Sequence, residues 1–463
     1  MPQPARRIVR NEREPQARRG PGGPGRRSKA PQLERLIDAM VELSGQHGYQ
    51  AVSIAQVSSR AGVSSATFYE HFADREDCLL AAYRNVTERT MARLTGPLQQ
   101  AEDWAQAARG AFGELLASLQ DDPNGARVMF VEALAGGERV HEELAEVTGA
   151  LEQTGEALLD GVPVAETTLD VPARALMGAV RGIVSRHLRT YTEDRLAGLT
   201  DDLLAWIGSY AVPAEGGRWS TSEAALLSVP ELPPRQGPRQ ELPPELDRLP
   251  RGRHGLPASV VARSQRTRIV FATCWVTMEK GYSNATVADI VAAAGVAKEA
   301  FYRHFHDKEE AFREAQSYGT HFVLDTLVSA YFAAEGWPQR VWGALGTLLE
   351  LVAANPTLAH LRFVASYTAG GDAIRRAEDV TRFFTFFLEE GYAQRPQARE
   401  LPRLSSQAIA SAVFEIVQRE VAQGRLAELP RLRPQLAYVA IAPFLGPEGA
   451  VAEIEAMAGR GAV

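Results

Sequence analysis

Residues 48–76 read GYQAVSIAQVSSRAGVSSATFYEHFADRE, and residues 281–309 read GYSNATVADIVAAAGVAKEAFYRHFHDKE. The second stretch lies 233 positions after the first, and 12 of the 29 aligned residues are identical without a gap. A repeat at a fixed offset indicates that one structural unit occurs twice in the chain. The fold of one copy therefore predicts the fold of the other.

Helix start signals recur in both stretches. Ser53 stands three residues before Gln56, which is the spacing of a capping box, and this predicts that a helix begins at Ile54. Thr286 and Asp289 give the same signal in the second stretch. In a capping box the two side chains accept hydrogen bonds from backbone N–H groups that the first helical turn leaves unpaired.

A glycine separates this short helix from the next one. Gly62 and Gly295 stand where a tight turn between two helices needs a residue that tolerates positive φ. Ser64 can then cap a further short helix, in which Phe68 points inward and Tyr69 outward. Two short helices around a glycine turn, packed on a longer amphipathic helix, form a helix-turn-helix. Its second helix fits the major groove of DNA, which is roughly 12 Å wide.

Both stretches resemble the N-terminal DNA-binding domain of TetR-family transcriptional regulators. The resemblance is carried by G-Y-x(3)-S-I-A-x-V-x(3)-A-G-V in the first copy and G-Y-x(3)-T-V-A-D-I-V-A-A-A-G-V in the second. Each motif is followed by F-Y-x-H-F-x-D-x-E, and the likeness covers residues 33–92 and 266–325. The segments after these motifs resemble the family's C-terminal domain only in being helical and of suitable length.

The resemblance implies which residues contact DNA. The polar side chains at both ends of the second helix would reach base edges and flanking phosphates. These residues are Ser53, Ser64, Ser65, Thr67, Tyr69 and His71 in the first copy, and Thr286, Lys298, Glu299, Tyr302, His304 and Lys308 in the second. Tyrosine and histidine on a helix are also common surface residues with no ligand, and this alternative stays open.

The second copy departs from the family pattern at the start of its recognition helix. Ala297 replaces the usual small hydroxyl residue and cannot cap. Glu299 would repel phosphate unless it accepts a hydrogen bond from a cytosine amine, and Ala300 offers only an apolar contact. In the first copy, Ser65 stands where the family commonly has lysine. The second copy is therefore expected either to bind DNA more weakly or to read a different half-site.

Charge is distributed unevenly along the chain of 463 residues, whose net charge is −7. Residues 1–30 hold nine basic and two acidic residues, a net +7, so the remainder sums to −14. A basic arm on an acidic body is compatible with DNA binding, because phosphate contacts act over about 10 Å or less. Two interpretations stay open: a solvated disordered tail, or an arm that adds sequence-independent phosphate affinity.

The periodicity of apolar residues predicts an all-α chain of two tandem TetR-like units. Each unit is expected to hold an N-terminal helix-turn-helix domain and a helical C-terminal ligand and dimerisation domain. The expected boundaries are a basic arm over 1–30, DNA-binding domains over 31–92 and 260–325, helical domains over 93–212 and 326–446, a linker over 213–259 and a tail over 447–463. The linker is placed by nine prolines in residues 213–257. The tail is expected to be weakly helical at best.

The two larger helical domains are interpreted as effector and dimerisation domains. By resemblance, residues 172–191 and 199–212, and their counterparts 404–423 and 431–445, would form a four-helix dimer interface. Large apolar side chains could line a ligand cavity, although for any one of them ordinary core packing is the more common explanation. These are Trp104, Phe112, Met129, Phe130, Trp337, Trp342, Phe363, Tyr367, Phe383, Phe384, Phe386 and Phe387.

Several classes of protein are disfavoured by the sequence. Cys78 and Cys274 form no metal or redox motif, and such sparse cysteine fits a reducing compartment. No apolar run approaches the roughly 20 residues that span a bilayer. The segment 141–143 (HEE) lacks the second histidine of a zinc-protease helix, and no phosphate-binding loop occurs. We therefore expect a cytoplasmic, non-enzymatic protein with no metal, no cofactor and no membrane partner.

The sequence as a whole predicts a transcriptional regulator that binds double-stranded DNA, and more specifically a repressor released by an unknown small-molecule effector. The alternative is a ligand- or partner-binding protein in which the second DNA-binding unit has lost DNA contact. One chain already carries two recognition helices. Self-association is therefore expected either as an intramolecular pseudo-dimer or as a homodimer of tandem chains.

Overall fold

A computed structural model describes residues 29–101, 104–137, 139–140, 142–144, 146–147, 149, 167–169, 173–190, 198–213, 256–369 and 371–460. Almost all of the expected basic arm and of the expected linker lies outside these residues, because α1 already begins at Lys29. The described residues up to 213 are called unit 1, and those from 256 onward are called unit 2. No helix among them is both long and apolar enough to cross a membrane.

Unit 1 begins with three helices of a helix-turn-helix and continues with longer helices. The first elements are α1 (Lys29–His47), η1 (Tyr49–Ala51), α2 (Ile54–Ala61), α3 (Ser65–His71) and α4 (Arg75–Gln100). The helical domain then adds α5 (Trp104–Asp121), α6 (Pro123–Arg127), η2 (Val128–Glu132), η3 (Ala133–Ala135), α8 (Ala173–Thr190) and α9 (Leu199–Gly208).

Unit 2 repeats this order and extends it. Its DNA-binding part contains α11 (Ala258–Lys280), α12 (Val287–Ala294), α13 (Lys298–His304) and α14 (Lys308–Phe332). The helical domain contains α15 (Trp337–Ala354), α16 (Pro356–His360), η6 (Leu361–Ala365), α17 (Ser366–Thr368), α18 (Gly371–Phe383) and η7 (Phe384–Ala393). It ends with α19 (Pro396–Arg399), α20 (Leu404–Ala422), η8 (Leu426–Leu432), α21 (Arg433–Leu445) and α22 (Pro447–Arg460).

The expected all-helical fold is confirmed, with one small addition. Two three-residue strands, β1 (Thr167–Leu169) and β2 (Ala211–Pro213), pair antiparallel with Thr168 opposite Val212. Strands this short carry no alternating pattern long enough to detect in a sequence, because a half-buried strand is recognised over four or more residues.

The local helix signals in the repeat are confirmed. Ser53 and Gln56 form a complete capping box at the start of α2, and Thr286 and its partner at N3 do the same for α12. Gly62 and Gly295 end these helices in the left-handed conformation, with φ of 64° and 61°. Both turns therefore depend on a residue without a Cβ atom.

The constant offset of 233 extends well beyond the quoted stretch. It relates α5 to α15, α6 to α16, and the π-helical turn η2 to η6 without a gap. A π turn is rare and often marks a functional site, so its recurrence at the same place in both units identifies one shared architecture. Residue identity follows the same offset, because 11 of the 32 residues in 104–135 are identical to their counterparts in 337–368.

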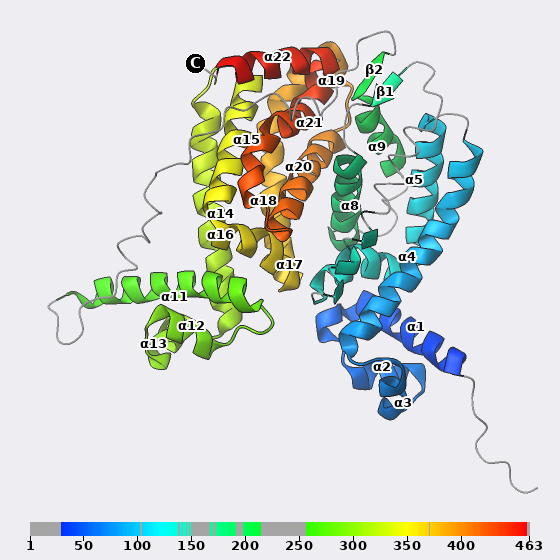
Figure 1. The fold of residues 1–463 in the computed structure, drawn as a ribbon, viewed down its shortest axis with the longest axis vertical. Helices are drawn as coiled ribbons and strands as arrows, with labels where there is room; N and C mark the ends of the chain where they lie inside the picture. Colours follow the sequence, from blue (N-terminus) through cyan, green and yellow to red (C-terminus); the bar gives the residue numbers. More distant parts are fainter. Residues whose placement is uncertain are drawn as a thin grey trace, which may run out of the picture.

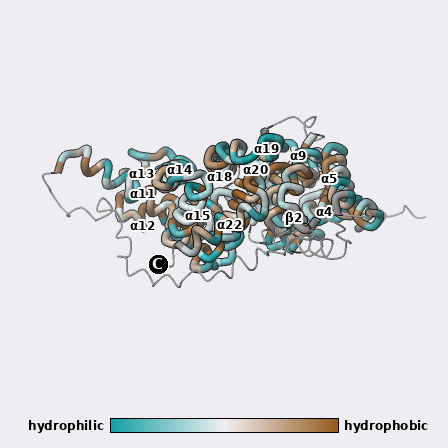
Figure 2. Tube along the Cα trace, turned by 90° about the horizontal axis from the view of Figure 1, so that it is seen from above, coloured by the Kyte–Doolittle hydropathy of each residue, from teal (hydrophilic) through white to brown (hydrophobic). Residues whose placement is uncertain are grey.

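The two units pack against each other through α8 and α20, which lie side by side in the centre of the molecule (Figure 1). Glycines on α8 permit this close approach. A Cβ atom at Gly178 would lie 2.3 Å from Cγ of Glu415, and one at Gly182 would lie 2.8 Å from Cβ of Ser411. Figure 2 shows hydrophobic residues around α20, most of whose side chains are buried.

Polar contacts fix the register of the two units. Arg181 pairs with Glu415, and Arg189 pairs with Glu378 on α18. The hydroxyl of Tyr210, a fully buried side chain, donates a hydrogen bond to the carbonyl of Val439 at 2.7 Å. Buried polar contacts with defined partners favour one alignment over its neighbours, because a shifted register would leave these groups unpaired.

The helix-turn-helix parts of the two units lie at the same end of the molecule. Figure 1 shows α1–α3 and α11–α13 on either side of the central helices, with α22 and the two strands at the opposite end. Both recognition helices are thus presented at one end by a single chain.

The expectation of a weakly helical tail after residue 446 is wrong. Residues 447–460 form α22, which packs along α21. Ala450, Ile454 and Met457 are buried at helical spacing and form its apolar stripe. The stripe contains only three residues, which is too short a periodic pattern to predict a helix from the sequence.

Replacement of Ile454 by alanine is expected to destabilise the chain by about 2–5 kcal/mol, because the side chain is fully buried and its removal leaves a cavity. Glu455→Ala, at an exposed position on the same helix, serves as the matched control and is expected to change stability by less than about 0.5 kcal/mol. Urea unfolding followed by circular dichroism measures both. Equal midpoints for the two variants would mean that α22 is not a packed part of the fold.

Candidate nucleic-acid interface

The first turn of α3 presents a hydroxyl-rich surface in unit 1. The hydroxyl of Ser64 accepts a hydrogen bond from the backbone N–H of Thr67 at 3.1 Å, as expected for an N-cap. Its oxygen also lies 3.0 Å from the hydroxyl of Thr67, which is half-buried. Ser65 is exposed at the first helical position. Ser64 and Thr67 therefore stabilise the helix start, and Ser65 is the better placed of the three to meet a base edge.

Tyrosines occupy the same position on both recognition helices. Tyr69 is 59% exposed and Tyr302 is 52% exposed, although both are large aromatic residues. Each ring packs edge-on against the preceding, fully buried phenylalanine, with centroids 5.6 Å apart for Phe68 and 5.4 Å apart for Phe301. Packing against the buried ring keeps the tyrosine side chain directed outward. Each recognition helix therefore exposes a hydroxyl group that can donate a hydrogen bond.

The recognition helix of unit 2 differs from that of unit 1 in capping and in charge. Ala297 makes no side-chain cap, which leaves the start of α13 with one fewer partner. Lys298, Glu299 and Arg303 are all exposed, and the ammonium of Lys298 lies 5.9 Å from the ring centroid of Tyr302. Arg303 was not among the DNA-contacting residues expected from the sequence, and its counterpart in the repeat is the acidic Glu70.

The two histidines expected to meet phosphates are only half exposed. Nε2 of His71 and Nε2 of His304 are shielded from solvent and have no hydrogen-bond partner among the described residues. Burial lowers the pKa of His304, and the nearby Arg303 and Arg266 lower it further. A neutral imidazole is a weak phosphate ligand, so the surroundings of His304 do not favour it as a phosphate contact.

Ser53 and Thr286 are exposed, and their hydroxyl groups belong to the capping boxes of α2 and α12. The hydroxyl of Ser53 accepts from the N–H of Gln56 at 3.3 Å, and that of Thr286 accepts from the N–H of Asp289 at 3.2 Å. Each hydroxyl still has acceptor capacity and stands at a helix N-terminus, where partial positive charge gathers. These two positions are compatible with a phosphate contact in addition to their capping role.

Lys308 has a structural role that the sequence analysis did not foresee. Its ammonium donates to the carbonyls of Tyr282, Ser283 and Ala285 at 3.0, 3.3 and 3.0 Å. Burial lowers the pKa of Lys308. At the matching position of unit 1, Arg75 makes the same kind of contact with the carbonyls that follow Gly48, including that of Val52 at 2.7 Å. All three donors of the ammonium are in use, so the geometry does not favour Lys308 as a phosphate ligand.

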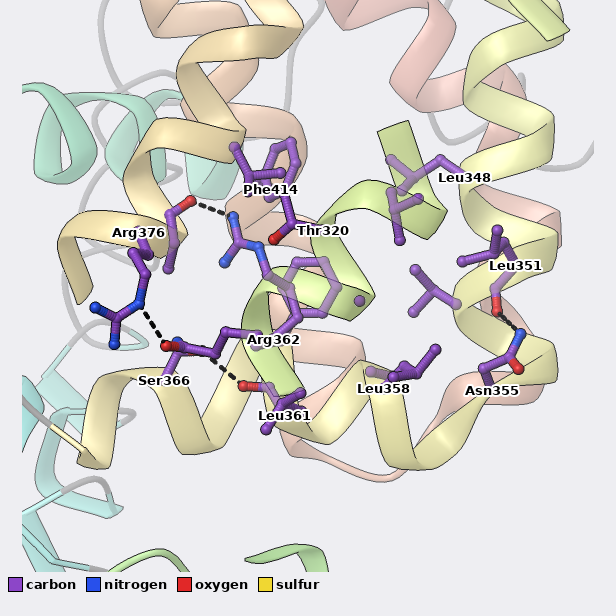
Figure 3. Close-up of a pocket in the computed structure, with 18 residues that line it drawn as sticks. Thr320, Leu348, Leu351, Asn355, Leu358, Leu361, Arg362, Ser366, Arg376 and Phe414 are labelled. Carbon is purple, nitrogen blue, oxygen red and sulfur yellow. Dashed lines mark hydrogen bonds between the residues drawn. The ribbon is translucent and has the colours of Figure 1, made fainter. Parts of the chain in front are cut away.

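A cavity of about 640 Å³, part of it open to solvent, lies in the helical domain of unit 2 (Figure 3). Of the aromatic residues suggested by the sequence, only Phe363 lines it. Phe384 and Phe387 line a separate apolar hollow, and Tyr367 lines a third one between the units. The polar side chains of the cavity were missed, because an arginine within a helical stretch gives no signal of burial. These are Gln316, Thr320, Asn355, Arg362, Ser366 and Arg376.

Comparison with known proteins gives two matches to one family. Residues 36–82 and 269–315 both match the family described as bacterial regulatory proteins, tetR family. A fatty acid metabolism regulator protein of Bacillus subtilis is 20% identical over 166 residues, which cover 36% of this chain and 86% of that protein.

Two further likenesses extend over parts of this chain. The transcriptional activator FasR of Mycolicibacterium smegmatis is 28% identical over 116 residues, 24% of this chain and about half (53%) of the relative. Among solved structures, the fatty acid degradation regulator FadR of Bacillus halodurans aligns with 41% of this chain and 96% of its own length. It is 19% identical, with a TM-score of 0.34.

Lys308→Met is expected to lower the stability of the chain by about 1–3 kcal/mol, because three carbonyls, two of them in partly buried contacts, lose their shared donor. Lys298→Met removes an exposed ammonium and is expected to change stability by less than about 0.5 kcal/mol. Thermal unfolding of both variants, followed by circular dichroism, makes the comparison. An unchanged transition in Lys308→Met would show that the three contacts do not hold the domain together.

Proposed function

We propose that this chain, which belongs to the TetR family and carries two of the family's DNA-binding units, is a ligand-responsive repressor that acts as an intramolecular pseudo-dimer. As a family member it is a DNA-binding transcriptional regulator. The observation that carries the proposal is the presentation of two matched recognition helices, α3 and α13, at one end of a single chain.

The pairing of the two units within one chain is supported by the α8–α20 contact. Arginines on α8, namely Arg181, Arg186 and Arg189, face Glu415, Gln407 and Glu378 of unit 2. Two copies of α8 meeting each other would bring arginines together, and two copies of α20 would bring Glu415 residues together. Complementary charge therefore favours unit 1 with unit 2 over either unit with itself.

The two recognition helices are proposed to read different half-sites. Ser65 and Lys298 occupy the same exposed position in the repeat. A lysine ammonium can donate hydrogen bonds to the acceptor atoms of a guanine, whereas a serine hydroxyl can form hydrogen bonds with several different bases. Glu70 and Arg303 differ in sign at a second exposed position. A chain with two unlike helices needs no palindromic operator, in contrast to a dimer of identical chains.

Regulation is proposed to start from the cavity in unit 2. Its lining residue Leu361 also packs in the core of the second helix-turn-helix, together with Ile269 and Phe301. A ligand that favours one position of Leu361 therefore biases the position of α13. Successive major grooves lie about 34–36 Å apart, so a shift of one recognition helix weakens binding of the pair.

A second candidate function is a regulator in which only unit 1 contacts DNA. The missing side-chain cap at Ala297 and the exposed carboxylate of Glu299 favour it. The charge of α13 disfavours this second function. Lys298 and Arg303 outnumber the single acidic residue of the helix, so its net charge attracts phosphate.

Tyr69→Ala and Tyr302→Ala are each expected to lower DNA affinity about 2- to 10-fold for all sequences alike, because each removes one exposed donor to phosphate. Tyr318→Ala, at an exposed tyrosine on α14, is the control and should leave affinity unchanged. Fluorescence anisotropy titrations with DNA from upstream of the coding sequence, at one fixed salt concentration, measure the DNA affinity of all three variants. A loss confined to Tyr69→Ala would establish the second candidate function, and no loss in either variant would remove the tyrosines from the interface.

Charge reversal at Arg181 tests the intramolecular pairing. Arg181→Glu places two carboxylates together and is expected to cost between the roughly 1 kcal/mol of an exposed pair and the roughly 3–5 kcal/mol of a buried one. The double variant Arg181→Glu, Glu415→Arg should recover both stability and DNA affinity. Light scattering of the wild-type chain should give 50.4 kDa. A stable species of twice that mass, or no recovery in the double variant, would contradict the pseudo-dimer.

A further inference from the structure

The cavity in unit 2 contains a buried cation with free hydrogen-bonding capacity. Arg362 lies in the π-helical turn η6, and its Nη2 donates to the carbonyl of Ala377 at 2.7 Å and to the hydroxyl of Thr381 at 3.1 Å. Its Nε and Nη1 are shielded from solvent and have no hydrogen-bond partner among the described residues. Buried donors are normally paired, so this guanidinium is missing an acceptor.

The surroundings of Arg362 supply little compensating charge. The guanidinium carbon lies 5.2 Å from the ring centroid of Phe363 and 4.9 Å from that of Phe414. Burial lowers the pKa of Arg362, while the charge of Tyr367, a hydrogen bond to its side chain and the charge of Glu378 act in the opposite direction. Glu378 is already paired with the guanidinium of Arg189 in unit 1. No described side chain that lines the cavity carries a carboxylate.

A second cation faces the same cavity. Arg376 is half-buried, and its Nε donates to Oε1 of Gln316 at 2.8 Å. Nε2 of Gln316 in turn donates to the hydroxyl of Ser366 at 2.8 Å, which fixes the orientation of the amide. Burial and the nearby Arg313 lower the pKa of Arg376, and Glu309 opposes them. The two arginines thus form a positively charged end whose supporting side chains are already in place.

The other end of the cavity is apolar. Figure 3 shows Leu348, Leu351 and Leu358 across the cavity from Arg376 and Ser366. A cavity with a cationic end and an aliphatic end matches a ligand with an anionic head and an apolar body.

Unit 1 does not carry this arrangement at the equivalent positions. With the offset of 233, Arg362 corresponds to Met129, Arg376 to Glu143 and Gln316 to Tyr83. Met129 and Tyr83 are buried, and Glu143 is paired with Arg84. The cationic end therefore belongs to unit 2, although the backbone of the two units is repeated.

We propose that the effector of this regulator is an amphipathic organic anion, bound in unit 2 with its carboxylate or phosphate head between Arg362 and Arg376. The proposal rests on the proposed function in one respect, because it names the ligand of the same regulatory cavity. Charge-assisted hydrogen bonds to the two guanidinium groups hold the head, and the leucines hold the body. The head supplies the acceptor that Nε and Nη1 of Arg362 lack.

Isothermal titration calorimetry of the full chain tests this with three probes of one chain length: dodecanoate, dodecyl phosphate and dodecan-1-ol. At least one anion should bind roughly 10- to 100-fold more tightly than the alcohol, as expected for charge-assisted hydrogen bonds in a desolvated site. The better of the two anions identifies the head group. Equal affinity for the alcohol and both anions would overturn the proposal.

Arg362→Met gives unit 2 the residue that unit 1 has at this position, and it removes a buried charge, so the variant should remain folded. It should lose the preference for the anion and keep the affinity for dodecan-1-ol. Arg382→Gln, at an exposed arginine of α18 paired with Asp379, is the matched control and should bind like wild type. Unchanged anion affinity in Arg362→Met would refute the assignment of the head group to this site.

DNA binding of the same proteins separates the two proposals. If the anion binds but leaves the anisotropy of the DNA complex unchanged, the ligand class is right and the proposed regulation is wrong. If the chain binds DNA with sequence preference but does not distinguish the anion from the alcohol, the regulator stands and the ligand proposal falls.

Discussion

The contact between α8 and α20 is the constraint on which the rest of the molecule depends. Two helix-turn-helix domains act together on DNA only if their separation is fixed, because successive major grooves lie about 34–36 Å apart. Gly178 and Gly182 allow the two helix backbones to approach, and the ion pairs of Arg181 and Arg189 select one alignment. A glycine replaced by a larger residue would push Glu415 or Ser411 away and change the separation at the far end of both units.

Joining two units in one chain also allows the two halves to differ in sequence, which is impossible in a dimer of identical chains. In such a dimer, every substitution appears in both halves. Here the backbone is repeated with a constant offset through the π turns, while the exposed and cavity-lining positions have diverged. Lys298 stands opposite Ser65 in the repeat, and Arg362 stands opposite Met129. One fold can therefore carry two unlike recognition helices, and a cavity lined by two arginines in only one half.

The sequence predicted those parts of the structure that local signals determine. Capping boxes, the two αL glycines and the inward phenylalanine depend on residues within a few positions of each other, and they are present as expected. The helices at the centre were also placed closely, with α8 over 173–190 and α20 over 404–422. Lys308 shows where such reasoning ends. Its position near the start of α14 suggested a phosphate contact, but three carbonyls from the preceding loop surround its ammonium.

The cavity could not be predicted for the same reason, and its construction places it beside the contact between the two units. Arg362 lines the cavity only because η6, α18 and α20 meet around it. A meeting of three distant segments cannot be predicted from a local sequence pattern. Its Nη2 is bonded to the carbonyl of Ala377, the residue next to Glu378, and Glu378 is the partner of Arg189 in unit 1. A head group that draws the guanidinium toward the cavity acts on α18, and α18 carries one side of the inter-unit contact. The proposed ligand site and the contact between the units therefore share α18, so that in the proposed function adjacent residues link ligand binding to the spacing of the recognition helices.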